Sequence, residues 1–177
     1  RWEEWPGIAQ VEKQLGVECF VVPEGGSNAL GLVGCAEILQ DPQPQDWDLV
    51  TVACGTGSTL AGLAAGTTHT QKILGYPALK GGGFLLDDTL AMLERTLGAE
   101  WLRVHQDKIQ LDLDYHFEGY GKVTPELIEF IRRFYKVTGV KLDPIYTGKM
   151  MFGVYQRAEE LRGARVLSIH TGGLQGV

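Results

Sequence analysis

The sequence predicts an α/β protein with an open, mostly parallel sheet and helices on both faces. Two observations support this prediction. Apolar segments of strand length alternate along the chain with segments whose apolar residues recur at helical spacing. In addition, most of the 24 glycines follow apolar runs. Strands that end in glycine turns are where an open α/β sheet forms its ligand crevice.

The strongest local signal lies at residues 48–66, with the sequence DLVTVACGTGSTLAGLAAG. Residues 49–53 form a short apolar run, which is typical of a central strand covered on both faces. A glycine-rich turn follows, and a helix of small residues begins near Thr59. This order predicts a central strand, a tight turn and a helix.

The glycine-rich turn contains the groups that bind an anion. Glycines let backbone N–H groups converge, hydroxyls add donors, and the helix N-terminus adds partial positive charge. We therefore predict a phosphate site at Cys54, Gly55, Thr56, Gly57, Ser58 and Thr59. The turn lacks the lysine of a Walker A loop and the spacing of G-x-G-x-x-G. The alternative is that these glycines serve only tight packing.

Composition narrows the class of protein. The chain has 177 residues, of which 44% are hydrophobic, so it can bury one sizeable core. A net charge of −6 without a basic cluster argues against nucleic acid and anionic membranes as partners. No apolar run approaches the ~20 residues that span a bilayer, so we expect a cytoplasmic protein.

The three cysteines are widely spaced among apolar or small residues, at Cys19, Cys35 and Cys54. This pattern favours buried, reduced thiols over a disulfide framework. No metal site is predicted.

The remaining elements follow from periodicity and turn chemistry. Further strands are predicted at 16–22, 72–79, 109–115 and 164–170. The opening segment 1–15 resembles the tail of a helix, and further helices are predicted up to 39, at 85–97, from 125 and at 150–161. Asn28, or Ser27, is expected to cap the helix that ends near 39, and Thr124 with Pro125 to begin another. Residues 41–46 are predicted to be a linker, and the acidic residues of 109–115 to be solvated on an edge strand.

Two tyrosines lie at positions where their rings are poorly placed for core packing. Tyr120 stands between two glycines, and Tyr146 lies in a turn that leads into a helix. The last predicted strand ends in a similar turn that begins with Thr171.

Four motifs in this order resemble a known family: PEGGSNALG at 23–31, ACGTGSTLAGL at 53–63, LDPIYTGK at 142–149 and IHTGG at 169–173. They are similar to the C-terminal half of the pyridoxal-phosphate enzymes of the 1-aminocyclopropane-1-carboxylate deaminase/D-cysteine desulfhydrase family. The resemblance implies a tryptophan synthase β-like fold, in which a large and a small α/β domain enclose the cofactor, and a homodimer. Residues 1–177 would form mainly the large, cofactor-binding domain.

The resemblance also implies roles for individual residues. The turn at 55–59 would hold the phosphate of pyridoxal 5'-phosphate. Thr171 would bind the pyridine nitrogen through its hydroxyl. Tyr146 and Tyr120 would face a small amino-acid substrate, with Tyr146 the better candidate for proton transfer.

Two motifs of the family are absent from these 177 residues. One is the N-terminal glycine–asparagine–lysine motif with the Schiff-base lysine, and the other is a glutamine–serine–asparagine motif. Lys149 belongs to the YTGK turn, Lys80 lies in a glycine loop, and the other lysines are expected on solvated faces. We therefore expect a fragment that is inactive alone and whose partner is the missing N-terminal segment.

The expected function of the intact parent is a lyase or deaminase reaction that converts a small amino acid to a 2-oxo acid and ammonia. Thr147 and Thr171 replace a glutamate and a leucine of the cyclopropane-opening enzymes, which favours D-cysteine desulfhydrase chemistry. The alternative is 1-aminocyclopropane-1-carboxylate deamination. A second alternative is a non-catalytic module that binds a phosphorylated metabolite through residues 55–59.

Overall fold

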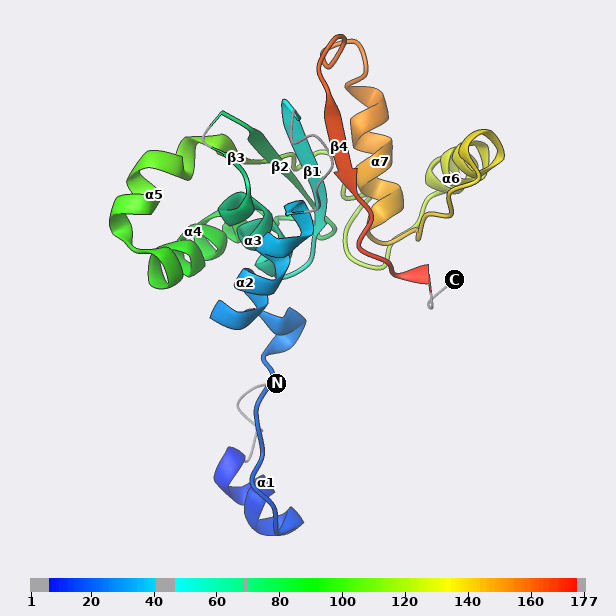
Figure 1. Ribbon diagram of the computed structural model, residues 1–177. Coiled ribbons are helices and arrows are strands. Elements are labelled where there is room, and N and C mark those ends of the chain that lie inside the picture. The colour runs from blue at the N-terminus through cyan, green and yellow to red at the C-terminus, as the bar shows by residue number, and fades with distance from the viewer. Residues whose placement is uncertain (1–6, 41–46, 69, 175–177) are drawn as a thin grey trace.

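A computed structural model describes residues 7–40, 47–68 and 70–174 of the chain. Its strands form one sheet in the order β3-β2-β1-β4, and every pair in the sheet is parallel (Figure 1). The strands are β1 (Leu49–Cys54), β2 (Lys72–Pro77), β3 (Ile109–Leu111) and β4 (Val166–Ile169). The predicted α/β class with an open parallel sheet is confirmed.

Helices cover both faces of this sheet (Figure 1). The helices of the described chain are α1 (Ile8–Leu15), which lies away from the sheet, and α2 (Ala29–Ala36), α3 (Ser58–Gly66), α4 (Phe84–Leu97), α5 (Ala99–His105), α6 (Pro125–Thr138) and α7 (Thr147–Gln156). Short 3₁₀ turns are η2 (Glu24–Gly26), η3 (Glu37–Leu39) and η4 (Gln106–Lys108). Helices α2 to α5 lie on one side of the sheet. Helix α7 lies on the other side, with α6 beyond it.

The central strand β1 divides its side chains between two cores. Val50, Val52 and Cys54 pack on the face that carries α3 and α4. Leu49 and Ala53 pack on the opposite face, together with Met150 of α7. All of β1 is buried, as predicted from its apolar run.

The small residues of α3 allow α2 to pack closely on it. A Cβ added at Gly62 would lie 2.7 Å from the carbonyl oxygen of Leu32, and one at Gly66 would lie 2.6 Å from that of Ala36. Side chains at either position would push the helices apart. This packing fixes the position of α3, whose N-terminus follows directly on β1.

Both predicted helix caps are confirmed. The Asn28 side chain accepts a hydrogen bond from the Gly31 N–H at 2.9 Å, and the Thr124 hydroxyl accepts one from the Leu127 N–H at 3.3 Å. Pro125 occupies the first turn of α6.

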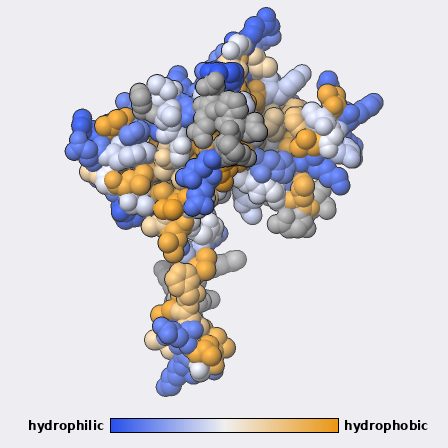
Figure 2. All heavy atoms as spheres, in the orientation of Figure 1, coloured by the Kyte–Doolittle hydropathy of each residue, from blue (hydrophilic) through white to orange (hydrophobic). Residues whose placement is uncertain are grey.

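The predicted strand at 16–22 is wrong. No strand is assigned there, and Phe20 and Val22 are 78% and 66% exposed. Together with α1 this segment extends away from the sheet, and Figure 2 shows its apolar surface in contact with solvent. Its β-branched residues have strand propensity, but no neighbouring strand in the described ranges pairs with them.

Several predicted boundaries also differ. β3 ends at Leu111. Of the two acidic residues predicted to be solvated, Asp114 is exposed, whereas the Asp112 side chain is only 10% exposed and pairs with Arg157 at 3.4 Å. β4 is half-buried because it lies at an edge of the sheet. Helix α7 begins and ends earlier than predicted.

Two predictions about buried groups need correction as well. Lys108 is 7% exposed rather than solvated, and its Nζ donates to the carbonyl oxygens of Thr67 and Thr68. Only Cys54 is buried, whereas Cys19 and Cys35 are partly exposed free thiols. The predicted linker 41–46 lies outside the described residues. Within the described ranges, no helix has the length and apolar character needed to cross a membrane.

Candidate functional site: an anion cup at the carboxyl edge of the sheet

The site lies where β1 and β4 end side by side at the carboxyl edge of the sheet. The chain leaves β1 into α3 on one face, and it enters β4 after α7 on the other, so a crevice opens between the two strands. A cavity of about 330 Å³ occupies this position. It is lined by Glu24, Gly25, Ala53, Cys54, Gly55, Thr56, Gly57, Ser58, Thr59, Leu60, Tyr146, Thr171, Gly172 and Gly173.

The glycine-rich turn at residues 55–59 lines this cavity. In the described parts of the chain, the N–H groups of residues 55–59 donate to no protein acceptor. Those of Ser58 and Thr59 belong to the first turn of α3, where a helix leaves its N–H groups unpaired. Converging N–H groups and the positive end of a helix dipole form an anion site.

The shape of the turn depends on two glycines. Gly57 has a φ of +83°, which favours glycine, and a Cβ there would lie 2.7 Å from the Thr89 hydroxyl. Gly25, with a φ of +65°, lies directly against the side chain of Thr56. The backbone of residues 55–57 can therefore remain close to its neighbours.

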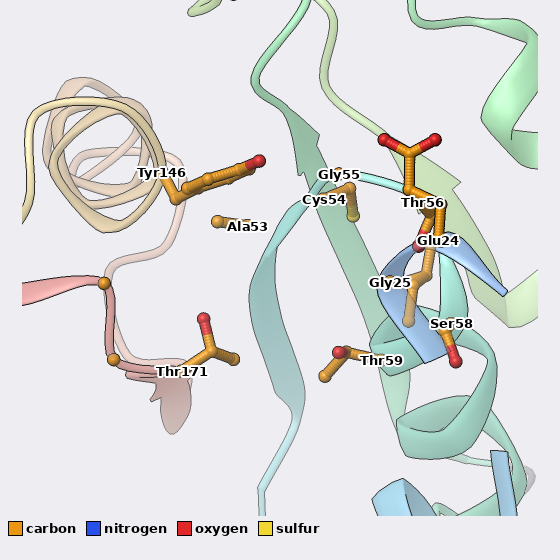
Figure 3. A pocket seen from close by; sticks show the side chains of 14 residues that line it. Glu24, Gly25, Ala53, Cys54, Gly55, Thr56, Ser58, Thr59, Tyr146 and Thr171 are labelled. Carbon is orange, nitrogen blue, oxygen red and sulfur yellow. The ribbon is translucent and has the colours of Figure 1, made fainter. Parts of the chain in front are cut away.

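The three predicted hydroxyls of the turn have different surroundings. Thr56 accepts a hydrogen bond from the Ser27 hydroxyl at 2.7 Å, and the buried Ser58 donates to the carbonyl oxygen of Gly26 at 3.4 Å. These two therefore fasten the turn to the segment before α2. Thr59 lines the cavity (Figure 3), and its hydroxyl accepts a hydrogen bond from the Cys35 thiol of α2 at 4.0 Å.

Cys54, the last residue of β1, lines the cavity, but its side chain is engaged elsewhere. Its thiol is buried among apolar residues of the α3 side, and the S–H donates to the Val52 carbonyl oxygen at 3.7 Å. Burial raises the pKa of this thiol to about 12. A neutral, enclosed thiol is unsuited to contact a phosphate.

Tyr146 covers the turn from the opposite side. A Cβ added at Gly55 would lie 3.4 Å from the ring and hydroxyl of Tyr146, so glycine provides the space for the ring. Burial, with a further contribution from the neighbouring Tyr120, raises the pKa of Tyr146 to about 12. The phenol is therefore neutral at pH 7 and is poised as a proton donor.

Tyr120 touches Tyr146 rather than the cavity. The two rings are edge to face with centroids 5.9 Å apart, and Tyr120 is 60% exposed. Tyr120 is not among the residues that line the cavity.

Asp143 holds Tyr146 at this position. Its buried carboxylate accepts hydrogen bonds from the backbone N–H groups of Ile145, Tyr146 and Thr147 at 2.7 to 2.9 Å, and from the Thr147 hydroxyl at 2.5 Å. The Asp143 N–H in turn donates to the Thr147 hydroxyl at 3.0 Å. This reciprocal arrangement resembles a capping box and fixes the first turn of α7.

The two threonines predicted to discriminate between reactions are not equivalent. Thr171 follows β4, lines the cavity and directs its hydroxyl into it (Figure 3). Thr147 is fully buried and engaged with Asp143, and it does not line the cavity. The Thr147 side chain therefore makes no contact with the cavity through which it could influence the choice of substrate.

We expect Asp143→Asn to lower the free energy of unfolding by about 1–3 kcal/mol at pH 7. The NH2 group of asparagine would face N–H or O–H donors that the carboxylate now accepts, and these donors would lose their acceptor. Burial raises the pKa of Asp143, but the hydrogen bonds from Thr147, Tyr146 and Ile145 outweigh it, so this pKa lies below its usual value. The stabilisation is therefore present above pH ~4 and is lost as the pH falls further. Urea unfolding of both proteins at pH 7 and pH 3 measures this. An equal difference at both pH values would contradict it.

Fold and site together define an α/β protein with an anion-binding turn at the carboxyl edge of its parallel sheet. Comparison with known proteins adds the family. A protein of Pyrococcus furiosus named "Putative 1-aminocyclopropane-1-carboxylate deaminase" is 32% identical over 96% of this chain and 54% of its own length. The "Bifunctional D-cysteine desulfhydrase/1-aminocyclopropane-1-carboxylate deaminase, mitochondrial" of Arabidopsis thaliana is 29% identical over 95% of this chain and 44% of its own length.

A solved structure agrees with these relatives. The crystal structure of a 1-aminocyclopropane-1-carboxylate (ACC) deaminase homologue superposes with a TM-score of 0.82 and 30% identity, over 96% of this chain and 53% of that chain. No family model matches the sequence. The resemblance is thereby confirmed: the chain is a relative of proteins named 1-aminocyclopropane-1-carboxylate deaminase and D-cysteine desulfhydrase. It spans about half the length of these relatives.

Sequence reasoning missed three contributors to the site. Glu24 and Gly25 line the cavity, although their segment was interpreted only as a turn before a helix. The carboxylate of Glu24 is turned away from Ser58 and Thr59, which leaves the N–H groups of α3 open to an anion (Figure 3). The glycine pair at 25–26 was a signal for this close approach. For Asp143 the sequence gave only a weak indication of its role in the site, an acidic residue four positions before a threonine.

Proposed function

We propose that this chain provides the phosphate-binding part of a pyridoxal 5'-phosphate enzyme that converts a small amino acid to a 2-oxo acid and ammonia. The observation that supports this most is the row of free N–H groups at 55–59, which faces a tyrosine and a threonine across one cavity. The names of the relatives point to the same chemistry. The activity belongs to the full-length protein, with the lysine that holds the cofactor outside these 177 residues.

The residues present fit this cofactor. The unpaired N–H groups at 55–59 would neutralise a phosphate, and Gly55 and the Tyr146 ring lie beside each other in the cavity lining, where a planar ring could be held. When bound, pyridoxal phosphate supplies the electron sink for breaking a bond at or beside Cα of the substrate. Thr171 would hold the pyridine nitrogen with a neutral hydroxyl, which could not keep it protonated as a carboxylate would.

Tyr146 acts on the substrate in this proposal. Its neutral phenol donates a proton to the atom that leaves or to the carbon that gains one. Tyr120, packed edge to face on Tyr146, restricts the ring to one orientation. Asp143 fixes the backbone from which Tyr146 projects.

We favour D-cysteine as substrate, with β-elimination that releases sulfide. Thr171 is the residue that supports this choice, because a weak electron sink suffices when an α-proton is removed and thiolate leaves. 1-Aminocyclopropane-1-carboxylate has no α-hydrogen and is the alternative substrate.

Supplying the full-length enzyme with both substrates tests this choice. We expect sulfide from D-cysteine, and we expect Thr171→Ala to reduce its release by roughly tenfold, as the loss of one hydrogen bond of about 1–1.5 kcal/mol implies. Release of 2-oxobutanoate from the cyclopropane substrate without sulfide from D-cysteine would overturn the preference. Unchanged activity in Thr171→Ala would remove this residue from the site.

A different class remains as the second candidate, a non-catalytic module that binds a phosphorylated metabolite at residues 55–59. The same N–H groups favour it. The two candidates differ in one respect: only the enzyme forms a covalent bond between pyridoxal phosphate and a lysine. Borohydride reduction of the full-length protein followed by peptide mass spectrometry detects this bond. Its absence would favour the module.

Partners in this proposal are the remaining segment of the same protein and a second copy of the whole. Apolar side chains stand exposed on the segment before α2, on α2 and at the start of α4, including Phe20, Leu30 and Phe84, which are 78%, 75% and 51% exposed. Surfaces of this kind are typically covered in an assembly. We expect the 177-residue piece to associate in sedimentation experiments. Monomeric, sharply melting behaviour would contradict this.

A further inference from the structure

Lys149 is buried within the structure and is not used by the proposed chemistry. Its side chain is 1% exposed, yet its Nζ lies within hydrogen-bond distance of three carbonyl oxygens: Gly119 at 2.8 Å, His116 at 2.9 Å and Ala78 at 3.3 Å. An ammonium group has three N–H donors, so each finds an acceptor. A lysine in this state is not available as the one that holds a cofactor.

Two of the acceptors belong to a strained loop. Phe117 and Glu118 have φ angles of +49° and +66°, which residues other than glycine rarely adopt, and Gly119 follows with a φ of +127°. This conformation turns the carbonyl oxygens of His116 and Gly119 toward the same point. The cation at that point compensates the strain with charge-assisted hydrogen bonds.

The loop carries Tyr120, directly after Gly119. Lys149 lies in the first turn of α7, three residues after Tyr146. One side chain therefore connects the backbone that supports Tyr120 with the helix turn that supports Tyr146. The two rings meet edge to face between these anchors.

We infer that Lys149 is a positioning residue: its ammonium group fastens the loop of residues 116–121 to α7 and thereby sets the Tyr120 ring against Tyr146. The inference rests on the proposed function only for its effect on catalysis. The tether itself, meaning the hydrogen bonds from Lys149 to this loop, involves only residues of this chain.

The chain offers a matched control. Lys108 is also buried and also donates to backbone carbonyl oxygens, at 3.1 and 3.3 Å, but these belong to Thr67 and Thr68 at the far end of α3. Lys108→Met therefore removes a similar buried cation without touching the tyrosine pair. Lys149→Met removes the tether.

The experiment uses the full-length protein labelled with 3-fluorotyrosine and observed by ¹⁹F NMR, with signals assigned through Tyr120→Phe and Tyr146→Phe. We expect Lys149→Met to shift both signals and to accelerate tryptic cleavage after Lys122 at least tenfold, while Lys108→Met does neither. Where Lys149→Met does not fold, Lys149→Gln, which keeps two N–H donors, is measured in the same way. Glu118→Gly relieves the strain at that position, and we expect it to slow the cleavage of Lys149→Met.

Unchanged tyrosine signals and cleavage in the Lys149 variant would overturn the inference, and so would equal changes in the Lys108 variant. Both readouts are independent of turnover. Failure of the wild-type protein to act on D-cysteine or the cyclopropane substrate would instead overturn the proposed function. With an active enzyme, we expect Lys149→Met to lower kcat in the wild type and to have no further effect in Tyr120→Ala, which lacks the ring that the tether positions.

Discussion

Tyr146→Phe is expected to lower turnover of D-cysteine by the full-length enzyme by about 10²- to 10⁴-fold, the range typical for loss of a general acid or base. The ring and its contact with Gly55 are kept, so only the hydroxyl is lost. Because burial raises the pKa of Tyr146 to about 12, this phenol stays protonated throughout the neutral range. We therefore expect no alkaline decline from Tyr146 between pH 7 and pH 10.

Steady-state kinetics with a cofactor titration measure this prediction. Tyr155→Phe is the matched control, because Tyr155 belongs to α7, which begins directly after Tyr146, is 59% exposed and does not line the cavity. We expect it to leave both kcat and cofactor affinity unchanged. A Tyr146→Phe enzyme with wild-type kcat would show that another group moves the proton.

Thr59→Asp is expected to weaken binding of pyridoxal phosphate by about 100-fold or more. Two unit charges about 4 Å apart repel by roughly 4 kcal/mol at the effective dielectric constant near a protein surface. The helix itself gains, because a carboxylate in the first turn of α3 interacts favourably with the helix dipole by about 0.3–1 kcal/mol. Binding and stability should therefore move in opposite directions.

Thr59→Asn is the control, since it matches aspartate in size and shape without the charge. Equilibrium titration with the cofactor and thermal melting of the three full-length proteins measure both effects. We expect the asparagine variant to bind within a few-fold of wild type. Equal weakening in both variants would show that the Thr59 hydroxyl, rather than the charge of the site, controls affinity.

The fold and the anion-binding turn could be predicted because their determinants are local. β1, the turn and α3 follow one another in 18 residues from Leu49 to Gly66, and each has its own pattern: an apolar run, alternating glycines and a helix of small residues. The caps at Asn28 and Thr124 were predictable for the same reason. Consecutive elements of this kind need no knowledge of distant partners.

The supporting contacts could not be predicted, because they join distant parts of the chain. Lys149 meets carbonyl oxygens 30, 33 and 71 residues away, and the Arg157–Asp112 pair spans 45 residues. A lysine in the sequence carries no sign of such partners, so a solvated position is the ordinary expectation.

The error at residues 16–22 has a related cause. Strand propensity is a preference for a pleated, half-buried surface, and a segment such as Phe20–Val22 realises it only if another strand lies alongside. The interpretation of Thr147 failed because the sequence does not say which way a side chain at the start of a helix points. Its hydroxyl meets Asp143, four residues earlier.

The most direct test of the account is to compare how the full-length protein binds pyridoxal 5'-phosphate and pyridoxal, which differ only in the phosphate. Each charge-assisted hydrogen bond contributes about 1.5–3 kcal/mol, so the loss of two or more from residues 55–59 should weaken binding at least 100-fold. We predict this difference in Kd by calorimetric titration, and its near disappearance in Thr59→Asp. Equal Kd values for the two compounds in the wild-type protein would contradict the assignment of the turn as the phosphate site.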